Sequence, residues 1–391
     1  MLHQGTVDLL QQPPAPAIAE LLCRRPSSIR KPAVGCTGRL SGIGTIMVQI
    51  FTVLGARPQF IKAAPVSRAI AEAGMTEVIA HTGQHFDALM SDVFFDELDI
   101  PKPSYNLEVN SLGHGAMTGR MLEKLEEAML AEKPDAVLIY GDTNSTIAGA
   151  LAAAKLNIPV AHVEAGLRSF NRRMPEEVNR VVADHVSSLL FCPTETAVAN
   201  LAAEGITKGV HAVGDVMFDT TLAAVKRAEG RSTIIETHGL RPGSYAVATI
   251  HRAENTDDPE RFARVVAWLE AAAHEVPVVM PVHPRTRKLL TGRGLAPAGV
   301  TLIDPIGYLD MARLLSQAAA VFTDSGGLQK EAYFHRAPCV TLRDETEWVE
   351  TIEAGWNRLW TGPDYTARRD IPDYGTGRAA QAIAKLLHEA I

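Results

Sequence analysis

The feature that most constrains this chain is a repeated unit: a short β-branched run, a loop rich in glycine or polar residues, and a helical stretch. In the first unit, residues 47–53 form the apolar run, residues 54–58 interrupt it, and a helical pattern continues through Ile70. Runs of the same kind recur at residues 77–82, 136–140, 159–163, 245–250, 277–282, 320–323 and 338–342. Alternating strands and helices are typical of a parallel sheet with helices on both faces. The sequence therefore predicts an α/β fold.

The length and the number of units predict two domains. The chain has 391 residues, and one ordinary core holds about 100–200. We expect a first domain over residues 47–216 and a second over residues 217–375, with a C-terminal helix at 376–391 that could pack back on the first. Residues 1–46 show no sustained period, so we expect a disordered extension or the product of an upstream start codon.

Composition excludes several classes of protein. Lys and Arg total 38 against 45 Asp and Glu, a net charge of −7, which argues against binding to nucleic acid or to an anionic membrane. We find no apolar run of about 20 residues, so we expect no bilayer span. The four cysteines have neither disulfide-framework nor metal-ligand spacing, which favours a reducing cytoplasm and no structural metal.

A glycine pair after the run at 320–323 predicts an anion site. Ser325, Gly326 and Gly327 precede a helical stretch, so backbone N–H groups, a hydroxyl and a helix N-terminus could meet a phosphate. Glu331 follows about two turns later, where a carboxylate could bind two adjacent ribose hydroxyls. An N-capped helix with a flexible turn is an equally good interpretation of this loop taken alone.

Two cations follow the first strand. Arg57 lies on the loop and Lys62 on the first helical turns, an arrangement that suits a diphosphate. A solvated cation pair is the alternative. The loop lacks the GxGxxG pattern, so the sequence does not support a nicotinamide or flavin cofactor.

Carboxylates end two consecutive strands. Asp142 and Glu164 follow the runs at 136–140 and 159–163, and consecutive strands are often neighbours. Carboxylates crowded in a cleft acquire separated pKa values and can share acid and base work. Glu176 and Glu177 open a later helix, where acids also favour the helix dipole, and Arg180 has the spacing to pair with Glu177.

Histidines end two strands of the second series. His251 is followed by Arg252 and Glu254, and His283 follows the next strand. Histidine is a usual proton donor to a leaving phosphate. A metal cluster is the rival, which the neighbouring cations disfavour.

Together these motifs resemble the non-hydrolysing UDP-N-acetylglucosamine 2-epimerase family, and most closely its UDP-2,3-diacetamido-2,3-dideoxy-glucuronate branch. The resemblance runs from Met47 to the C-terminus through residues 55–62, 140–146, 162–168, 174–180, 251–252, 281–283 and 323–331. It implies a GT-B-like fold of two Rossmann-like domains with UDP between them, a homodimer, no metal or redox cofactor, and a place in polysaccharide or O-antigen precursor supply. The segments at 249–258 and 346–350 point to the diacetamido branch, whereas the ordinary enzymes typically carry Arg-Pro at Trp348 and Val349.

The resemblance also assigns roles by position. The catalytic set it implies is Asp142, Glu164, Glu176, Arg180 and His251. The nucleotide and phosphate contacts it implies are Arg57, Lys62, Ser325, Gly326, Gly327 and Glu331, to which the charged loop adds Arg252. A second, activating UDP-sugar site would use Gln84, Arg120 and His283, although Asp87 stands where glutamine is usual.

The chemistry explains why several carboxylates are needed. The C2 proton of such a sugar is not next to a carbonyl, so direct deprotonation is unfavourable, and the C1–O bond to UDP is expected to break first and make that proton acidic. Inversion then requires acid/base groups on both faces of the glycal. A hydrolysing epimerase, a GT-B glycosyltransferase and a non-catalytic UDP-sugar sensor remain alternatives.

Overall fold

The first sheet is parallel throughout. The computed structural model describes residues 47–84 and 98–391. Within these residues, seven strands pair in the order β3-β2-β1-β4-β5-β6-β7. They are β1 (Gln49–Leu54), β2 (Thr76–His81), β3 (Tyr105–Asn106), β4 (Ala136–Tyr140), β5 (Val160–Val163), β6 (Leu189–Cys192) and β7 (Val210–Ala212). The strand order reverses between β1 and β4, and such a reversal is where open α/β sheets bind ligands.

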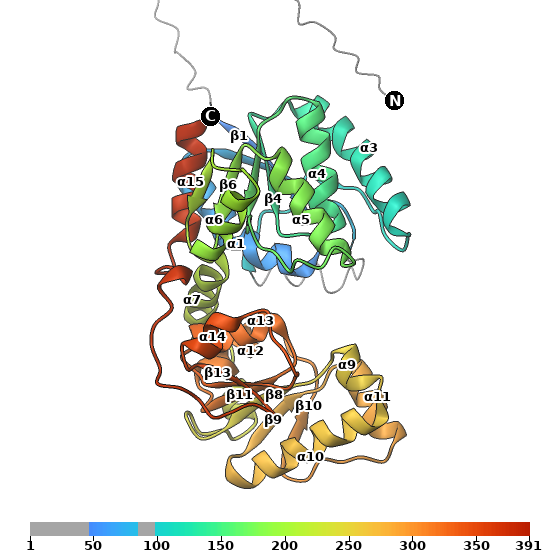
Figure 1. The fold of residues 1–391 in the computed structure, drawn as a ribbon, viewed down its shortest axis with the longest axis vertical. Coiled ribbons are helices and arrows are strands. Elements are labelled where there is room, and N and C mark those ends of the chain that lie inside the picture. The colour runs from blue at the N-terminus through green and yellow to red at the C-terminus, as the bar shows by residue number, and fades with distance from the viewer. Residues whose placement is uncertain (1–46, 85–97) are drawn as a thin grey trace, which may run out of the picture. The chain divides into compact units, whose positions relative to one another are not determined.

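Helices cover both faces of this sheet (Figure 1). Side chains of successive strand residues point to opposite faces, so Val137 and Ile139 of β4 belong to one core cluster and Leu138 and Tyr140 to the other. The first cluster packs against α3 (His114–Glu132), α4 (Asn144–Lys155) and α5 (Pro175–Val186). The second packs against α1 (Arg57–Glu72), α7 (Val216–Ala228) and α15 (Ala379–Ala390). A smaller cluster lies under α6 (Glu195–Ala203).

The second sheet repeats the plan. Six strands of the described chain pair in parallel in the order β10-β9-β8-β11-β12-β13. They are β8 (Ala246–Thr249), β9 (Val278–Pro281), β10 (Val300–Ile303), β11 (Ala320–Thr323), β12 (Cys339–Thr341) and β13 (Asn357–Leu359). The accompanying helices are α8 (Ile234–Thr237), α9 (Ala253–Thr256), α10 (Pro259–Glu275), α11 (Pro284–Gly292), α12 (Tyr308–Ser316), α13 (Gly326–Phe334), α14 (Val349–Glu353) and the 3-10 turn η1 (Pro372–Tyr374). Val247 and Val279 face one cluster, and Ala248 and Met280 face the other.

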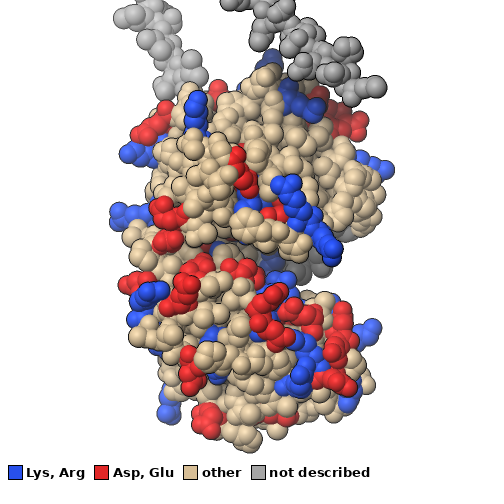
Figure 2. Space-filling model, in the orientation of Figure 1, with Lys and Arg blue, Asp and Glu red and all other residues tan. Residues whose placement is uncertain are grey.

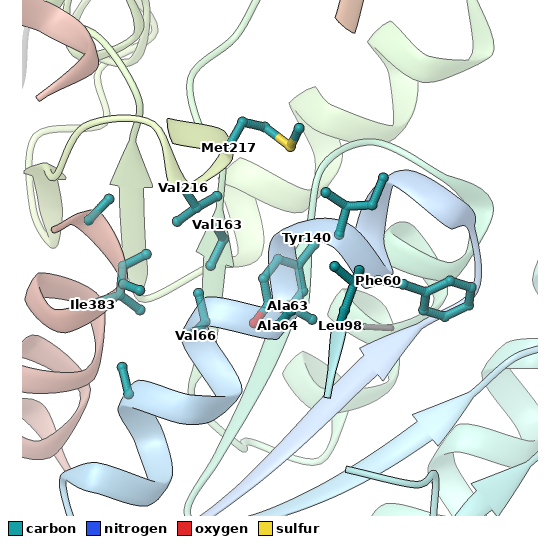
Figure 3. Packing of buried hydrophobic residues seen from close by; sticks show 14 of the residues in the cluster. Phe60, Ala63, Ala64, Val66, Leu98, Tyr140, Val163, Val216, Met217 and Ile383 are labelled. Carbon is teal, nitrogen blue, oxygen red and sulfur yellow. The ribbon is translucent and has the colours of Figure 1, made fainter. Parts of the chain in front are cut away.

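Helix α7 belongs to the cores of both halves. Figure 3 shows Val216 beside Val163 of the first sheet, and Met217 and Ile383 of α15 belong to the same cluster. The same cluster continues to Tyr308 of α12 and to residues of α13. The C-terminal helix therefore packs on α1 and α7 rather than on the second sheet.

Acidic and basic side chains are interspersed on the face drawn in Figure 2. No helix among residues 47–84 and 98–391 has the length and apolar character to cross a membrane. Cys192 and Cys339 are buried and free, and burial raises the pKa of each thiol to about 12. Cys23, Cys36 and the predicted extension at 1–46 lie outside the described residues.

A buried carboxylate fixes the start of the C-terminal helix. Asp219 of α7 accepts hydrogen bonds from the backbone N–H groups of Ala379 (3.2 Å) and Ala380 (2.9 Å). We expect Asp219→Ala to lower the free energy of unfolding by about 1–2 kcal/mol, because two N–H groups of the first turn lose their cap. Urea denaturation measures the change, and Asp364→Ala, at an exposed position, is the control. Equal stability of the two variants would contradict this role.

Candidate active site

Asp142 and Glu164 lie at the carboxyl ends of neighbouring strands. Tyr140 at the end of β4 pairs with Val163 at the end of β5, so the two carboxylates follow paired positions. Between Tyr140 and Asp142, Gly141 turns the chain with a φ of 59°, and Glu164 itself has a φ of 72°. A Cβ placed on Gly141 would lie 3.4 Å from the Glu164 carboxylate. Both carboxylates therefore lie in neighbouring turns at the carboxyl ends of β4 and β5.

Glu164 is paired with Lys62 of α1. The Lys62 ammonium contacts the Glu164 carboxylate, and the two side chains are 12% and 11% exposed. Burial acts to raise the pKa of Glu164, but the charges of Lys62 and Lys330 outweigh it, and the pKa is lowered. Glu164 is thus a half-buried but ionised carboxylate, the form that a general base requires.

Asp142 is paired with Arg180 of α5. The guanidinium contacts Asp142 and also Glu177, whose Oε2 lies 3.1 Å from Nη1. The predicted pairing of Glu177 with Arg180 is therefore confirmed. Glu177 also accepts hydrogen bonds from the Ser169 N–H and hydroxyl (2.9 Å each) and from the Phe170 N–H (3.0 Å), so it anchors the turn before α5. Glu176, one residue earlier, is exposed on the first turn of α5.

The turn at Gly141 is supported by a buried histidine that the sequence analysis did not select as a site residue. His162 Nε2 lies 2.8 Å from the Gly141 carbonyl, and Nδ1 lies 2.7 Å from the buried Asp184. Asp184 also accepts from Arg168. A histidine inside an apolar strand is the only signal that the sequence offered for this support.

In the second half, Asp324 organises the histidine loop. This carboxylate, directly after β11, is fully buried and accepts from the backbone N–H groups of His251 (3.0 Å) and Arg252 (2.9 Å). Its other oxygen lies 3.2 Å from His251 Nδ1. The ring of His283 lies 5.9 Å from that of His251, and burial followed by the charge of His251 lowers the pKa of His283. The sequence shows Asp324 as a carboxylate at a strand end, but it did not predict that Asp324 would bind the His251 loop.

Helix α13 carries the predicted anion site. Ser325 caps it, with its hydroxyl 3.5 Å from the Leu328 N–H, and Gly327 is exposed with open space where a Cβ would stand. Burial raises the pKa of Glu331 to about 7, although the charges of Arg57 and Lys330 act to lower it. The positive charge of Arg57, on α1, therefore reaches Glu331 on α13 and also His283.

The three predicted activator-site residues are not joined to one another. Gln84 accepts from the Ser145 N–H (3.1 Å) and hydroxyl (2.9 Å), while Arg120 is exposed on α3 and His283 begins α11. No hydrogen bond or ion pair connects these three side chains in the described part of the chain. Position 87 lies outside the described residues.

No cluster of three or more His, Cys, Asp or Glu side chains suited to a metal ion occurs among residues 47–84 and 98–391. The charged groups of the site pair with Lys and Arg instead, as Lys62 with Glu164 and Arg180 with Asp142 show. The arrangement supplies an ionised carboxylate, a second carboxylate, an imidazole and a helix N-terminus open to an anion.

Comparison with known proteins identifies close relatives. The family model for UDP-N-acetylglucosamine 2-epimerase matches residues 68–370. A UDP-N-acetylglucosamine 2-epimerase homolog of Methanococcus maripaludis is 54% identical over 319 residues, 80% of this chain and 88% of that protein. The UDP-2,3-diacetamido-2,3-dideoxy-D-glucuronate 2-epimerase of Pseudomonas aeruginosa is 50% identical over 357 residues, 87% of this chain and 99% of that protein.

A solved structure confirms the predicted GT-B-like α/β fold of two Rossmann-like domains. The Methanocaldococcus jannaschii UDP-GlcNAc 2-epimerase in complex with UDP-GlcNAc and UDP has a TM-score of 0.76 at 40% identity. The match covers 88% of this chain and 100% of that one.

Gly327 allows the anion site to be tested without disturbing the fold. A methyl group at this helical position meets no atom within 4 Å, so Gly327→Ala should leave the protein as stable or slightly more stable. Gly327 is one of the two glycines of the predicted anion site, and a methyl group there would crowd a phosphate bound at the helix N-terminus, so we expect UDP affinity to fall at least about tenfold. Thermal unfolding and calorimetric titration measure the two effects. Gly119→Ala, in an equally open place on α3, is the matched control, and unchanged UDP affinity in Gly327→Ala would contradict the assignment.

Proposed function

Because the chain belongs to the UDP-N-acetylglucosamine 2-epimerase family, we propose that it inverts C2 of a UDP-2-acetamido sugar without hydrolysing it. The observation that carries this proposal is the pair of carboxylates at adjacent strand ends, each held by its own cation. The helix N-terminus of α13 and Glu331 on the same helix complete it, and the charge of Arg57 on α1 acts on Glu331.

The first step of the proposed reaction breaks the bond between C1 and the UDP oxygen. The electron pair of that bond leaves with UDP, and C2 becomes acidic as positive charge builds at C1. The cations and the helix N-terminus that surround the diphosphate lower the barrier. We assign this role to Arg57, Arg252, His251 and the turn formed by Ser325, Gly326 and Gly327. Asp324 fixes the His251 ring, which suits that imidazole to give a proton to the leaving phosphate.

The second step removes the C2 proton and leaves a glycal with a C1=C2 double bond. We assign acid/base work to Asp142, Glu164 and Glu176, with Arg180 orienting Asp142. Contact with Lys62 holds Glu164 in the ionised form, which is able to accept a proton. Return of a proton to the other face, as UDP adds again to C1, gives the inverted sugar. Closure of the cleft would retain the glycal between the two steps.

Two UDP-sugars are candidates for the natural substrate. The M. jannaschii structure supports UDP-N-acetylglucosamine, and UDP-N-acetylmannosamine would be its product here. The P. aeruginosa relative, aligned over almost its whole length, supports the 2,3-diacetamido uronate. Trp348 and Val349, where Arg-Pro is usual in the first group, favour the second. We also propose a cytoplasmic homodimer that supplies polysaccharide or O-antigen precursors, with no nucleic-acid or membrane partner and no metal or redox cofactor.

Exchange of the C2 proton tests the proposal directly. We expect each productive UDP-sugar, incubated with the enzyme alone in D2O, to gain deuterium at C2 while the nucleotide sugar stays intact. Nuclear magnetic resonance detects the exchange, and parallel reactions with the two candidate sugars identify the substrate. Release of free sugar would instead indicate a hydrolysing epimerase, and absence of exchange a glycosyltransferase or a sensor.

Glu164→Gln is the matched control for that experiment. It keeps the shape of the side chain but cannot accept the proton, so we expect turnover to fall by about 10²–10⁴-fold. Asp142→Asn should behave in the same way. Full activity in both variants would exclude these carboxylates as the acid/base groups.

The raised pKa of Glu331 predicts that ribose binding depends on pH. Glu331 must be ionised to accept hydrogen bonds from two ribose hydroxyls, and its pKa is about 7 in the free protein. Below that pH a proton on the carboxylate competes with the ribose hydroxyls. We therefore expect uridine affinity to decrease by up to about tenfold for each unit that the pH is lowered. Uridine is the suitable probe because it has the ribose diol and no phosphate to titrate. Glu331→Gln should bind more weakly than the wild type above about pH 7 and lose the dependence; an unchanged slope would contradict the role.

A further inference from the structure

One buried carboxamide joins two segments of the proposed site, and the proposed mechanism does not use it. The first segment, the arginine loop, is residues 55–57 between β1 and α1; the second, the Asp142 turn, is residues 141–143 between β4 and α4. Gln59 lies on the first turn of α1, two residues after Arg57, and is 2% exposed. A buried amide is almost always hydrogen-bonded, so its partners show which segments it holds.

The carboxamide oxygen of Gln59 holds the arginine loop. Oε1 accepts hydrogen bonds from the backbone N–H groups of Gly55 (2.8 Å) and Ala56 (3.0 Å), the two residues before Arg57. Ala56 is the cap residue of α1, but its methyl side chain accepts no hydrogen bond. Gln59 therefore caps the helix from its own first turn and fixes the backbone from which Arg57 projects.

The carboxamide nitrogen of Gln59 holds the Asp142 turn. Nε2 lies 2.8 Å from the Tyr140 carbonyl oxygen and 3.0 Å from the Thr143 hydroxyl, so the two contacts flank Asp142 in the sequence. The Thr146 hydroxyl of α4 lies 3.1 Å from the same nitrogen. A helix cap requires only the carboxamide oxygen, so the contacts of the nitrogen are additional to capping.

These partners also determine which way the carboxamide points. In the reversed orientation, the NH2 group of Gln59 would face the two N–H donors of the arginine loop. The carboxamide oxygen would then face the Tyr140 carbonyl, and neither end could form a hydrogen bond with its neighbour. The observed orientation is therefore the one in which a single side chain bonds to both segments.

Gly55 shows independently that the arginine loop packs on the segments beside it. A Cβ at this position would overlap the hydroxyl oxygens of Ser145 on α4 and Thr82 after β2. Only glycine, which has no side chain, allows the loop to lie this close to the first turn of α4. The loop and the start of α4 are thus in direct contact, and Gln59 supplies hydrogen bonds between them.

We propose that Gln59 is a positioning residue for the reaction proposed above, because it holds Arg57, assigned to the diphosphate, in a fixed place relative to Asp142, assigned to proton transfer. The inference rests on that proposed function. The bond to UDP breaks at C1 and the proton leaves from C2, the adjacent atom, so the groups that serve these two atoms must keep a constant separation. A displacement of about 1 Å can cost about 100-fold in rate.

Gln59→Met tests this role, because it keeps the length of the side chain and removes every hydrogen bond of the carboxamide. We expect kcat for C2 proton exchange to fall about 10–100-fold and UDP affinity to fall about tenfold. Uridine has no diphosphate, so its affinity should stay within about twofold of the wild-type value. Nuclear magnetic resonance in D2O measures the exchange, and calorimetric titration measures the two affinities.

Gln59→Glu is the conservative variant. It keeps an oxygen for the two N–H groups of the arginine loop, and the hydroxyls of Thr143 and Thr146 can turn to donate to its second oxygen. The two segments stay joined, so we expect exchange and UDP affinity within about threefold of the wild-type values.

Thr52→Val is the control for stability. It removes a buried hydrogen bond between Thr52, in the middle of β1, and Glu77 of β2, and touches neither segment. We expect it to leave exchange and both affinities unchanged.

The outcomes separate positioning from stability. A folded Gln59→Met variant with wild-type exchange or wild-type UDP affinity would overturn the inference, as would equal losses of UDP and uridine affinity. The same losses in Thr52→Val, or losses in Gln59→Glu as large as those in Gln59→Met, would also overturn it. If Gln59→Met does not fold, Gln59 is a stability residue and the inference is again overturned. Failure of the wild type to exchange the C2 proton would instead refute the proposed function.

Discussion

Two carboxylates at the ends of adjacent strands repel each other, and in this site a separate cation offsets the charge of each one. The rest of the site depends on how the chain supplies those two cations. Neighbouring strands lie about 5 Å apart, so the turns that carry Asp142 and Glu164 start side by side. Arg180 reaches Asp142 from α5, which packs on one face of the sheet, and Lys62 reaches Glu164 from α1, on the other face. The site therefore needs both helical layers, which explains why an α/β sheet covered on two sides can hold it.

Local rules identified part of this site from the sequence. The pairing of Glu177 with Arg180 follows from helix geometry at i and i+3, and Ser325 is a good helix cap, so both could be predicted. The decisive ion pairs could not, because Lys62 and Glu164 are 102 residues apart and Lys330 and Asp215 are 115 apart. Such pairs depend on strand order and on the path of α7, which no short motif encodes.

The strands and helices were easier to predict than the contacts by which α7 joins the two halves of the chain. Short apolar, β-branched runs and the helical stretches between them recur often enough to predict parallel sheets. The role of α7 is different, because its residues enter the core of the first sheet and meet α12 and α13 as well. Asp219 on the same helix caps α15 across 160 residues of sequence. An amphipathic pattern shows that such a helix has an apolar face, but not that two partners share it.

The two half-buried glutamates of the site show how one set of cations can produce two different pKa values. Burial acts to raise the pKa of both Glu164 and Glu331, and Lys330 acts to lower both. Glu164 also has Lys62 in direct contact and becomes the stronger acid, whereas Glu331 has Arg57 as its other cation and keeps a pKa of about 7. One carboxylate is therefore ionised before any ligand arrives, and the other is left able to change its charge when a ligand binds. Groups with pKa values pushed apart in this way can divide base chemistry and ligand recognition between them. The direct contact of one lysine is what separates the two roles.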